Sequence, residues 1–515
     1  MSWAAGYNNS VAYTTGYYQE QSPTWLKAAL VMQRVAPLAD GKFTYCELGF
    51  GQGLTSLILA ATHPDGDFYA CDFNPLHVIA ASSIRDDARL PNLTLLENSF
   101  GELADGKVDL PMFDFVTLHG IVSWVSHETR AQIVRFLARY LKPGGVVQIS
   151  YNAMTACAQV QPLQRLLTLH ANNQGENWAG AATFARQLAD TNALHFQRNP
   201  DAAARVTSFA SSDTRYLVHE YMHEQWTPFH FTDMAKELAD AKLVFAGSAR
   251  YGQMSPVAWL TDEQAAIVGS IKDPLFAEEV RDYFCNRSFR SDVFVRGKAT
   301  LNDIRLREHA KRIHLWANPK AQYQQTVKIE HAQVNRTDAA HRPLFDLLRK
   351  SDMTLDQLFD APELAGHGID TIMQIVRFSL AAGETAIRYG DVQPRAAADR
   401  LNTVLLSHAE RGEKWDALAS PKFAGGVPVG LLDQLLIAPL RAKSDPKRAL
   451  TSDIDELVVH VERSLLNTGL NLNVGERVTP REEMPAAIRK ILDDSGAALI
   501  ALCDENDFWP AKSAK

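Results

Sequence analysis

The chain has 515 residues, of which 46% are hydrophobic, 22% charged and 9% aromatic, and its formal net charge is −8. A single hydrophobic core rarely grows to this size, so the length predicts two to four domains. The acidic balance argues against a broad nucleic-acid-binding face, and no run of about 18 apolar residues predicts a membrane span.

The N-terminal residues and the cysteines indicate the cell compartment. Residues 1–21 are rich in Tyr, Asn and Gly and lack the basic and apolar blocks of a secretory signal. The five cysteines are scattered and odd in number, which predicts neither a disulfide framework nor a cysteine-based zinc site. We therefore expect a cytoplasmic protein.

A glycine-rich turn near the N-terminus is the most informative segment. The pattern predicts a buried strand, a tight turn, a helix and a second strand at residues 43–48, 49–53, 54–62 and 68–71. The glycines allow a ligand to approach the backbone at the positive end of the helix. Asp72 ends the second strand, 23 residues after Gly49. That is about the offset at which an acid accepts hydrogen bonds from ribose hydroxyls.

The spacing of the glycines distinguishes between nucleotides. A nicotinamide or flavin fingerprint is G-x-G-x-x-G, whereas residues 47–53 follow E-x-G-x-G-x-G. This pattern resembles motif I of the S-adenosylmethionine-dependent methyltransferases with a Rossmann-like fold. The resemblance implies S-adenosyl-L-methionine as the cofactor, whose cationic sulfonium and ammonium make an acid at Glu47 electrostatically favourable. The alternative is a glycine turn that only packs a helix onto a strand.

Three further strands, at residues 93–97, 113–118 and 146–150, extend the predicted parallel sheet. Ligands bind at the carboxyl ends of such strands, so the residues that follow them are pocket candidates. The candidates for cofactor binding are Tyr18, Glu47, Gly49, Gly51, Gly53, Asp72, Phe73, Asn98, Ser99 and His119. The catalytic candidates are His119, Trp124, Tyr151 and Asn152. His119 is the preferred base or orienting group, and a structural hydrogen bond is its alternative role.

Several longer motifs are similar to one group of proteins. They are HGIVSWV (119–125), ISYNA (149–153), YLVHEY (216–221), WTPFHF (226–231) and NRSFRSDVFVRG (286–297). These motifs resemble bacterial methyltransferases that carry a methyltransferase regulatory domain, and among them the rickettsial-type protein-lysine methyltransferases that act on outer-membrane proteins. The resemblance implies a lysine acceptor and a dimerisation role for a helical insertion. Periodicity alone does not choose between a dimer interface and a cap over the pocket.

The resemblance also implies how the chain is divided. A Rossmann-like methyltransferase has a seven-stranded sheet, and its last strands fit residues 243–249 and 293–296 after a helix at 229–241. The methyltransferase domain then spans 1–300, with a helical insertion at 154–212, a regulatory segment at 213–250 and a smaller insertion at 251–282. The predicted fold class is α/β, with mainly α C-terminal domains.

The C-terminal part is expected to form two domains, at 301–395 and 396–515. Strand-like pieces are predicted at 313–316 and 326–329, helices at 341–349, 354–359 and 369–382, and a strand at 386–389. This order suggests a winged-helix-like middle domain. Its surface is not notably basic, so protein recognition or a structural role is favoured over DNA binding. The last domain is expected to be helical.

Three other patterns have competing interpretations. Residues 219–223 match H-E-x-x-H, but no third ligand is obvious, so we expect no metal site and place His223 on the surface. His219 and Glu220 remain candidates for the substrate entrance. The glycine-rich residues 420–430 lack the Lys-Ser/Thr ending of a phosphate loop and predict a plain turn. An N-terminal aromatic stretch, either a packed strap or a lid over the cofactor, contains Tyr7, Tyr13, Tyr17, Tyr18 and Trp25.

The expected activity is methyl transfer, in which an enzyme mainly aligns the donor and the acceptor. A lysine acceptor must first lose a proton, and a partly desolvated pocket lowers its pKa without a dedicated base. The first hypothesis is a protein-lysine N-methyltransferase with a protein partner. The alternatives are a small-molecule or glycan methyltransferase and a non-catalytic regulator that senses S-adenosylmethionine. We expect no nucleic-acid partner, and a homodimer is the oligomer that the resemblance favours.

Overall fold

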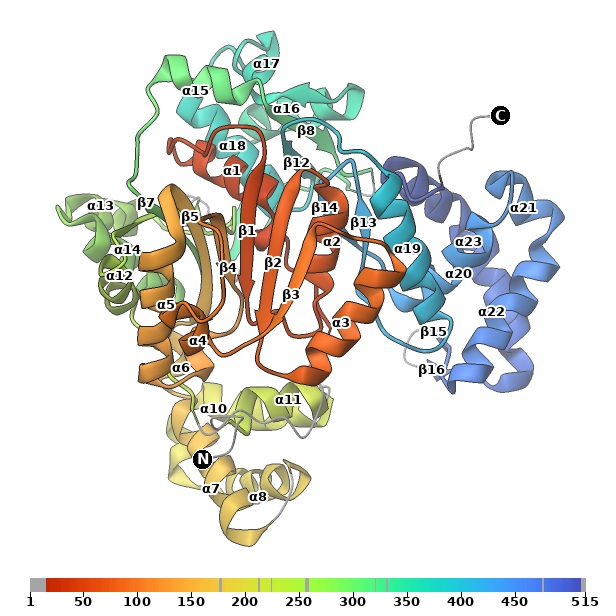
Figure 1. Ribbon diagram of the computed structural model, residues 1–515, viewed down its shortest axis with the longest axis horizontal. Coiled ribbons are helices and arrows are strands. Elements are labelled where there is room, and N and C mark those ends of the chain that lie inside the picture. The colour runs from red at the N-terminus through yellow and green to blue at the C-terminus, as the bar shows by residue number, and fades with distance from the viewer. Residues whose placement is uncertain are drawn as a thin grey trace.

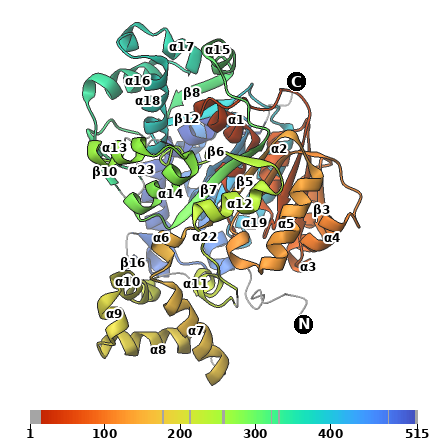
Figure 2. The same ribbon diagram turned by 90° about the vertical axis from the view of Figure 1, so that its left-hand side faces the viewer.

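The computed structural model describes residues 15–175, 178–211, 214–223, 225–254, 259–319, 321–329, 332–474 and 477–510. A seven-stranded sheet at the centre carries helices on both faces, and three further groups of elements surround it (Figures 1 and 2). In Figure 1 the helical insertion lies at the bottom, the middle segment at the top and the C-terminal helices at the right.

The central sheet has the strand order β3-β2-β1-β4-β5-β7-β6. Its strands are β1 (Phe43–Leu48), β2 (Gly66–Asp72), β3 (Leu93–Glu97), β4 (Phe113–Leu118), β5 (Leu141–Asn152), β6 (Leu243–Ser248) and β7 (Phe289–Arg296). β1 to β5 pair in parallel, and β7 is antiparallel to both β5 and β6. The predicted Rossmann-like α/β class is confirmed. The strand order reverses between β1 and β4, and their carboxyl ends border the crevice in which such sheets bind ligands.

Several boundaries differ from the prediction, and those of β5 and of the helix predicted at 229–241 do so because these segments pair with distant residues. β5 begins at Leu141, five residues early, since Leu141 pairs with Phe113 before a bulge shifts the register. The helix predicted at 229–241 is α12 (Phe231–Ala239), which begins two residues late because Phe229 forms an isolated bridge with Ala153.

Helices cover the two faces of the sheet in separate groups. The first group and its 3-10 turn are η1 (Gln19–Gln21), α1 (Pro23–Met32), α2 (Leu54–Thr62) and α3 (Pro75–Asp87). They pack on the face that presents Tyr45 and Phe68. The opposite face, with Val116 and Phe294, packs against α12, α4 (Phe100–Asp105) and α5 (His127–Tyr140). The short turn η2 (Val122–Trp124) follows β4 at the ligand-binding edge.

The segment after β5 is helical, as predicted. It contains α6 (Met154–Cys157), α7 (Gln161–Gln174), α8 (Trp178–Asp190), α9 (Leu194–Arg198), α10 (Pro200–Ser208), η3 (Phe209–Ser211) and α11 (Thr214–Tyr221). These helices form a lobe with a hydrophobic core of its own, which includes Leu163, Trp178 and Tyr221 (Figure 2). The described residues of the smaller insertion include α13 (Asp262–Ser270) and α14 (Pro274–Cys285).

The middle segment follows the predicted order of three helices and a strand. Its elements are α15 (Asp303–Ala310), β8 (Ile313–Ala317), β9 (Thr326–Ile329), β10 (Ala332–Asn335), α16 (Asp338–Lys350), β11 (Met353–Thr354), α17 (Leu355–Phe359), η5 (Pro362–Leu364), α18 (Ile369–Ala381) and β12 (Thr385–Tyr389). β8 lies between β11 and β12 in a small antiparallel sheet, and β9 and β10 form a hairpin. The core of this segment includes Val31 and Met32 of α1, so it packs directly on the N-terminal helix.

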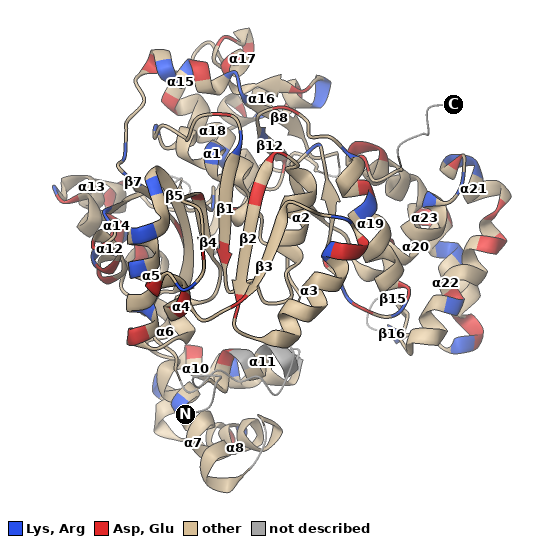
Figure 3. Ribbon diagram, viewed as in Figure 1, with Lys and Arg blue, Asp and Glu red and all other residues tan. Residues whose placement is uncertain are grey.

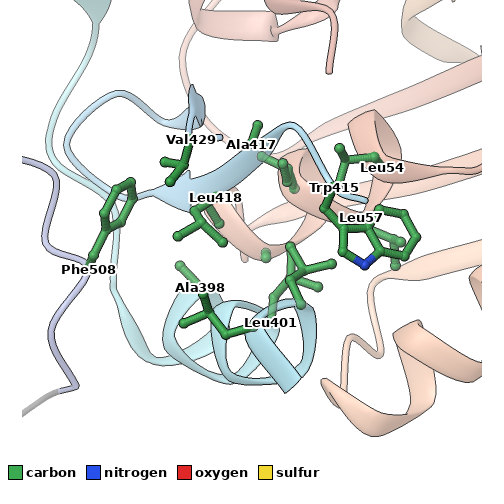
Figure 4. Close-up of a cluster of buried hydrophobic side chains, with 14 of the residues drawn as sticks. Leu54, Leu57, Ala398, Leu401, Trp415, Ala417, Leu418, Val429 and Phe508 are labelled. Atoms are coloured by element: carbon green, nitrogen blue, oxygen red, sulfur yellow. The ribbon is translucent and has the colours of Figure 1, made fainter. Parts of the chain in front are cut away.

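The C-terminal segment is mainly helical, as predicted. Its elements are α19 (Ala396–Ala409), β13 (Ala417–Ser420), β14 (Gly425–Pro428), α20 (Leu431–Arg441), α21 (Pro446–Ser452), α22 (Ile454–Thr468), β15 (Asn473–Val474), β16 (Arg477–Val478), η6 (Arg481–Glu483) and α23 (Met484–Glu505). Figure 4 shows Leu54 and Leu57 of α2 in one buried cluster with Leu401 of α19 and Leu418 of β13. The C-terminal segment and the central sheet therefore share one hydrophobic core.

Charges are interspersed over the helices that surround the sheet. Lys and Arg alternate with Asp and Glu along α19 to α23, while α7 and α8 carry few charges (Figure 3). Within the described ranges, no helix is both long and apolar enough to cross a membrane.

Candidate functional site

The glycine turn after β1 combines close packing with open space. Gly49, Gly51 and Gly53 have φ angles of 77°, 57° and 80°, which a residue with a Cβ rarely adopts. A Cβ on Gly49 would lie 2.2 Å from Cδ1 of Ile121, whereas a Cβ on Gly51 would meet no atom within 4 Å. Gly49 is therefore required by packing, and Gly51 borders space that a ligand can occupy.

Asp72 fixes this turn to the end of β2. Its Oδ2 accepts a hydrogen bond from the backbone N–H of Gly51 at 2.9 Å, and its Oδ1 accepts one from the N–H of Asn74 at 2.9 Å. Nδ1 of His77 lies 3.3 Å from the same Oδ1. The carboxylate, which is 5% exposed, thus stands beside the open space at Gly51, as the ribose interpretation requires.

Glu47 is buried near the end of β1, two residues before the first glycine of the turn. Its Oε1 accepts a hydrogen bond from Nε2 of Gln21 at 3.2 Å, and its Oε2 accepts one from the Ser56 hydroxyl. Burial raises the pKa of Glu47 to about 7, against the opposing effect of these two hydrogen bonds. An acid in this condition becomes more fully ionised when a cation lies nearby.

His119 at the end of β4 stacks on a tyrosine from the N-terminal segment. The rings of Tyr18 and His119 lie 3.5 Å apart and are tilted by 19°, and the backbone N–H of Tyr18 donates to Oγ1 of Thr55. Burial, with a contribution from Arg250, lowers the pKa of His119 to about 3, so its imidazole is neutral at physiological pH. Nδ1 of His119 is buried without a hydrogen-bond partner among the described residues.

These features fit S-adenosylmethionine. Space is open beside Gly51 and also beside Gly120, where a Cβ would meet no atom within 4 Å. The orphaned Nδ1 of His119 and the carboxylate of Asp72 offer polar partners for a nucleoside and an amino acid. A buried acid at Glu47 suits a ligand that carries positive charge.

The residues after β3 differ in how they are used. Ser99 is the N-cap of α4: its hydroxyl accepts from the N–H of Glu102 at 3.2 Å, and the Glu102 carboxylate accepts from the N–H of Ser99 at 3.0 Å. The Asn98 carbonyl accepts a hydrogen bond from the Cys71 thiol at 3.0 Å. The Ser99 side chain thus has a structural role. Of the two residues predicted to face the adenine, Asn98 and Ser99, Asn98 is the one whose side chain does not cap α4. Asn98 and the cofactor candidate Phe73 are both half-buried.

Aromatic side chains meet at the carboxyl ends of β4 and β5. Trp124 in η2 lies parallel to Trp226, with ring centroids 6.0 Å apart and planes tilted by 16°. Nε1 of Trp226 donates to Oδ1 of Asn152 at 3.2 Å, and the ring of His223 lies 5.3 Å from Trp124. Trp226 therefore joins the candidates Trp124 and Asn152 in one cluster.

Tyr151 does not belong to this group. Its side chain is 0% exposed, and its hydroxyl donates to Oδ2 of Asp292 at 2.6 Å. Successive side chains of a strand point to opposite faces, so Tyr151 enters the core while Asn152 faces the site. The sequence predicted Tyr151 as a catalytic pocket residue, but the structure places its side chain in the core.

The fold also separates the two histidines of the H-E-x-x-H pattern, because only the first lies in a helix. Helix α11 ends at Tyr221, so His223 lies beyond it, and His223 is 2% exposed rather than on the surface. The side chain of His219 lies outside the described residues. Within the described part of the chain, no group of three His, Cys, Asp or Glu side chains is placed to hold a metal ion.

The glycine-rich residues 420–430 form a hairpin that receives the N-terminal aromatic segment. A Cβ on Gly426 would lie 2.8 Å from the ring of Tyr17, and the N–H of Tyr17 donates to the carboxylate of Asp416. Trp25 donates from Nε1 to the carbonyl of Ala249 at 2.7 Å. Tyr17 and Trp25 thus act as a packed strap, while Tyr18 reaches the site; Tyr7 and Tyr13 lie outside the described residues.

Two residues of the site were missed in the sequence. Gln21 is fully buried and binds both Glu47 and the hydroxyl of Thr117. Trp226 was part of a recognised motif but was assigned no role. Their signal was weak, because both are brought to the site from outside the strand–turn–helix pattern.

Two family models match segments of the chain that contribute residues to the site. A family model described as "Methyltransferase domain" matches residues 46–147, and one described as "Predicted methyltransferase regulatory domain" matches residues 213–296. The uncharacterized protein sll1526 of a Synechocystis strain is 32% identical over 86% of this chain and 89% of its own length.

A solved structure shows the same fold over nearly the whole chain. PKMT2 from Rickettsia typhi in complex with AdoHcy matches with a TM-score of 0.69 and 17% identity, over 95% of this chain and 98% of that one. The uncharacterized protein RP789 of Rickettsia prowazekii is 22% identical over 50% of this chain and 46% of its own length. With the site geometry, these matches identify the chain as a member of the S-adenosylmethionine-dependent methyltransferases that carry a methyltransferase regulatory domain.

Proposed function

We propose that this methyltransferase methylates lysine side chains of a protein substrate. The name of the structural neighbour PKMT2 denotes a protein-lysine methyltransferase, and its likeness to this chain extends through the helical lobe and the C-terminal segments. The observation that carries the proposal is the cluster that follows β4 and β5, where two indole rings meet the amide of Asn152. The imidazole of His119, at the end of the same strand β4, is neutral.

Each cofactor residue has a proposed role. The turn from Gly49 to Gly53 holds the methionine part, Asp72 accepts hydrogen bonds from the ribose, and Phe73 and Asn98 contact the adenine. S-adenosylmethionine, when bound, would supply a methyl group on a sulfonium. The acceptor nitrogen, its proton already lost to water, would take the methyl group through its lone pair, and the electron pair of the broken carbon–sulfur bond would stay on sulfur.

The absence of a strong base at His119 favours an amine acceptor. An imidazole with a pKa of about 3 binds a proton weakly at neutral pH, so it removes protons poorly from an alcohol. A lysine amine in a partly desolvated pocket loses its proton to water more readily, and then needs only orientation. His119 is therefore proposed as an orienting group, with Nδ1 as its contact atom.

The experiment is to incubate cell extract with radiolabelled S-adenosylmethionine and the full chain, and to sort the label into protein, lipid or glycan, and small-molecule fractions. Label in protein that acid hydrolysis releases as methyl-lysine supports the proposal, with the Asp72→Ala variant as the control. Label found only in small molecules or glycans would show that the acceptor belongs to that class and is not a protein lysine. Cofactor binding without any labelled product would instead favour a sensor.

A further inference from the structure

The acceptor side is built from three separate segments of the chain. Trp124 follows β4, Asn152 ends β5, and Trp226 comes from the segment that matches the regulatory domain. Each of the three side chains is only partly buried, so each presents surface to an incoming group.

Backbone hydrogen bonds hold these segments in place. The N–H of Thr227 donates to the carbonyl of Ser123 at 2.8 Å, and the N–H of Asn152 donates to Oγ of Ser123 at 3.0 Å. The N–H of Phe229 donates to the carbonyl of Asn152 at 2.9 Å. The backbone directly after Trp226 is thus bonded to η2 and to the end of β5, which positions Trp226 at this edge of the sheet.

The same edge continues toward the cofactor side. Gly120 follows His119 and donates its N–H to Oγ of Ser150 at 2.9 Å, beside the open space described above. The proposed cofactor residues Gly51 and Asp72 follow or end β1 and β2, whereas the indole rings lie beside the carboxyl ends of β4 and β5. An acceptor that contacts the indoles therefore approaches from the β4 and β5 side of the crevice.

The chemistry of this surface fits an ammonium group. The faces of indole rings attract cations, and a carboxamide oxygen has two lone pairs. Oδ1 of Asn152 uses one lone pair for Nε1 of Trp226, which leaves the other for an N–H of the acceptor. The hydrogen bond from Trp226 also fixes which way the Asn152 amide is turned.

We propose that Trp226 recognises the acceptor lysine as an ammonium group when it first binds, before its proton is lost to water, with Trp124 as a second aromatic wall and Asn152 as the hydrogen-bond acceptor. The inference rests on the proposed lysine acceptor. The segment that matches the regulatory domain thereby supplies substrate specificity. Because Ala153 and Phe229 pair at the two ends of the helical lobe, the lobe is anchored at the same point.

The test measures binding separately from turnover. The full chain is labelled with 5-fluorotryptophan and saturated with S-adenosylhomocysteine, and the signals of Trp124, Trp226 and Trp509 are assigned by Trp→Phe variants. N-acetyl-lysine methylamide and its Nε-trimethyl form are the cationic probes, and N-acetyl-norleucine methylamide is the neutral isostere. Trp509 is the matched control, because its Nε1 also donates to a side chain, Oδ1 of Asp504, on the C-terminal segment.

The cationic probes are expected to shift the signals of Trp124 and Trp226 and to leave that of Trp509 unchanged. Trp226→Leu is expected to weaken their binding about tenfold, and Trp226→Phe less, since a phenyl ring keeps part of the cation attraction. Trp509→Phe is expected to bind as the wild type does. S-adenosylmethionine affinity, measured by calorimetry, should be unchanged in both Trp226 variants.

Three results overturn the inference: an unmoved Trp226 signal, equal binding of the lysine and norleucine probes, or loss of cofactor affinity in Trp226→Leu. If lysine in protein is labelled in the extract experiment while any of these occurs, the proposed function stands and the role of Trp226 falls. If the label appears only in small molecules, the proposed function itself fails.

Discussion

Replacing Glu47 by Gln tests the electrostatic account of the cofactor site. Glu47 is 3% exposed, and burial raises its pKa from 4.5 to about 7. This rise corresponds to about 3 kcal/mol, at about 1.4 kcal/mol for each pKa unit. Because the folded state holds the proton more tightly than the unfolded state, the stabilisation is fully present below pH 4.5 and is lost as the pH rises through about 7.

Glu47→Gln removes this dependence and keeps a side chain of the same shape between Gln21 and Ser56. The variant is therefore expected to be more stable than the wild type in alkaline buffer, by up to about 3 kcal/mol, and to lose this advantage in acid. Thermal melts without cofactor at about pH 5 and about pH 8.5 measure the gap in Tm, which should widen by a few degrees. Other buried acids, such as Glu220, contribute equally to the pH dependence of both proteins, so their contribution cancels in the difference in Tm. The same gap in Tm between the variant and the wild type at both pH values would refute the reasoning.

The same variant should bind the cofactor less well. Only S-adenosylmethionine carries a sulfonium, so Glu47→Gln is expected to lose affinity for it while keeping more of its affinity for S-adenosylhomocysteine. Wild-type affinity for S-adenosylmethionine should rise as the pH passes through about 7, with proton release detected by calorimetry in two buffers. An equal loss for both ligands would show that the carboxylate acts through the fold.

Three further predictions follow from the contacts. Asp72→Ala and Gly51→Val should each abolish S-adenosylmethionine binding in calorimetry with the circular dichroism unchanged, and unchanged binding in both would contradict the site. Arg290, 1% exposed, bonds Glu278, Asp282 and Asp292. Arg290→Ala should lower the free energy of unfolding by about 3–5 kcal/mol in denaturant titrations, since it leaves buried carboxylates unpaired. A decrease below about 1 kcal/mol, as for an exposed ion pair, would contradict this prediction. Burial raises the pKa of Glu220 to about 7, so wild-type stability should decline as the pH rises through this range. Glu220→Gln should make this decline smaller in thermal melts at several pH values. An unchanged dependence of Tm on pH would contradict the prediction.

The division of the chain at residues 300 and 395 stays a prediction, and the structure suggests how to test it. Leu401 and Leu418 share a core with Leu57, and Tyr17 packs against the 417–428 hairpin. A chain truncated after residue 395 would expose this core to water, so we propose that it aggregates or melts early. Cooperative unfolding of the truncated chain near the wild-type Tm would show that the C-terminal segment is separable.

The sequence by itself determined the parts of the site that are local. β1, the glycine turn and α2 have the predicted boundaries, because a short buried run, glycines with positive φ and a helix start are all encoded within a few neighbouring residues. Asp72 followed from the same short pattern, and it lies beside Gly51 as required. The order of elements in the middle segment was predictable for the same reason.

The tertiary structure decided everything that joins distant residues. No local pattern reveals that Trp226 bonds Asn152, that Gln21 bonds Glu47 or that Tyr17 fills the space above Gly426. Tyr151 and Asn152 are neighbours in sequence, and only the pairing of β5 with β7 shows which of them faces the core. Periodicity records which face of an element is apolar, but the partner that covers that face is chosen by the packing of the whole chain.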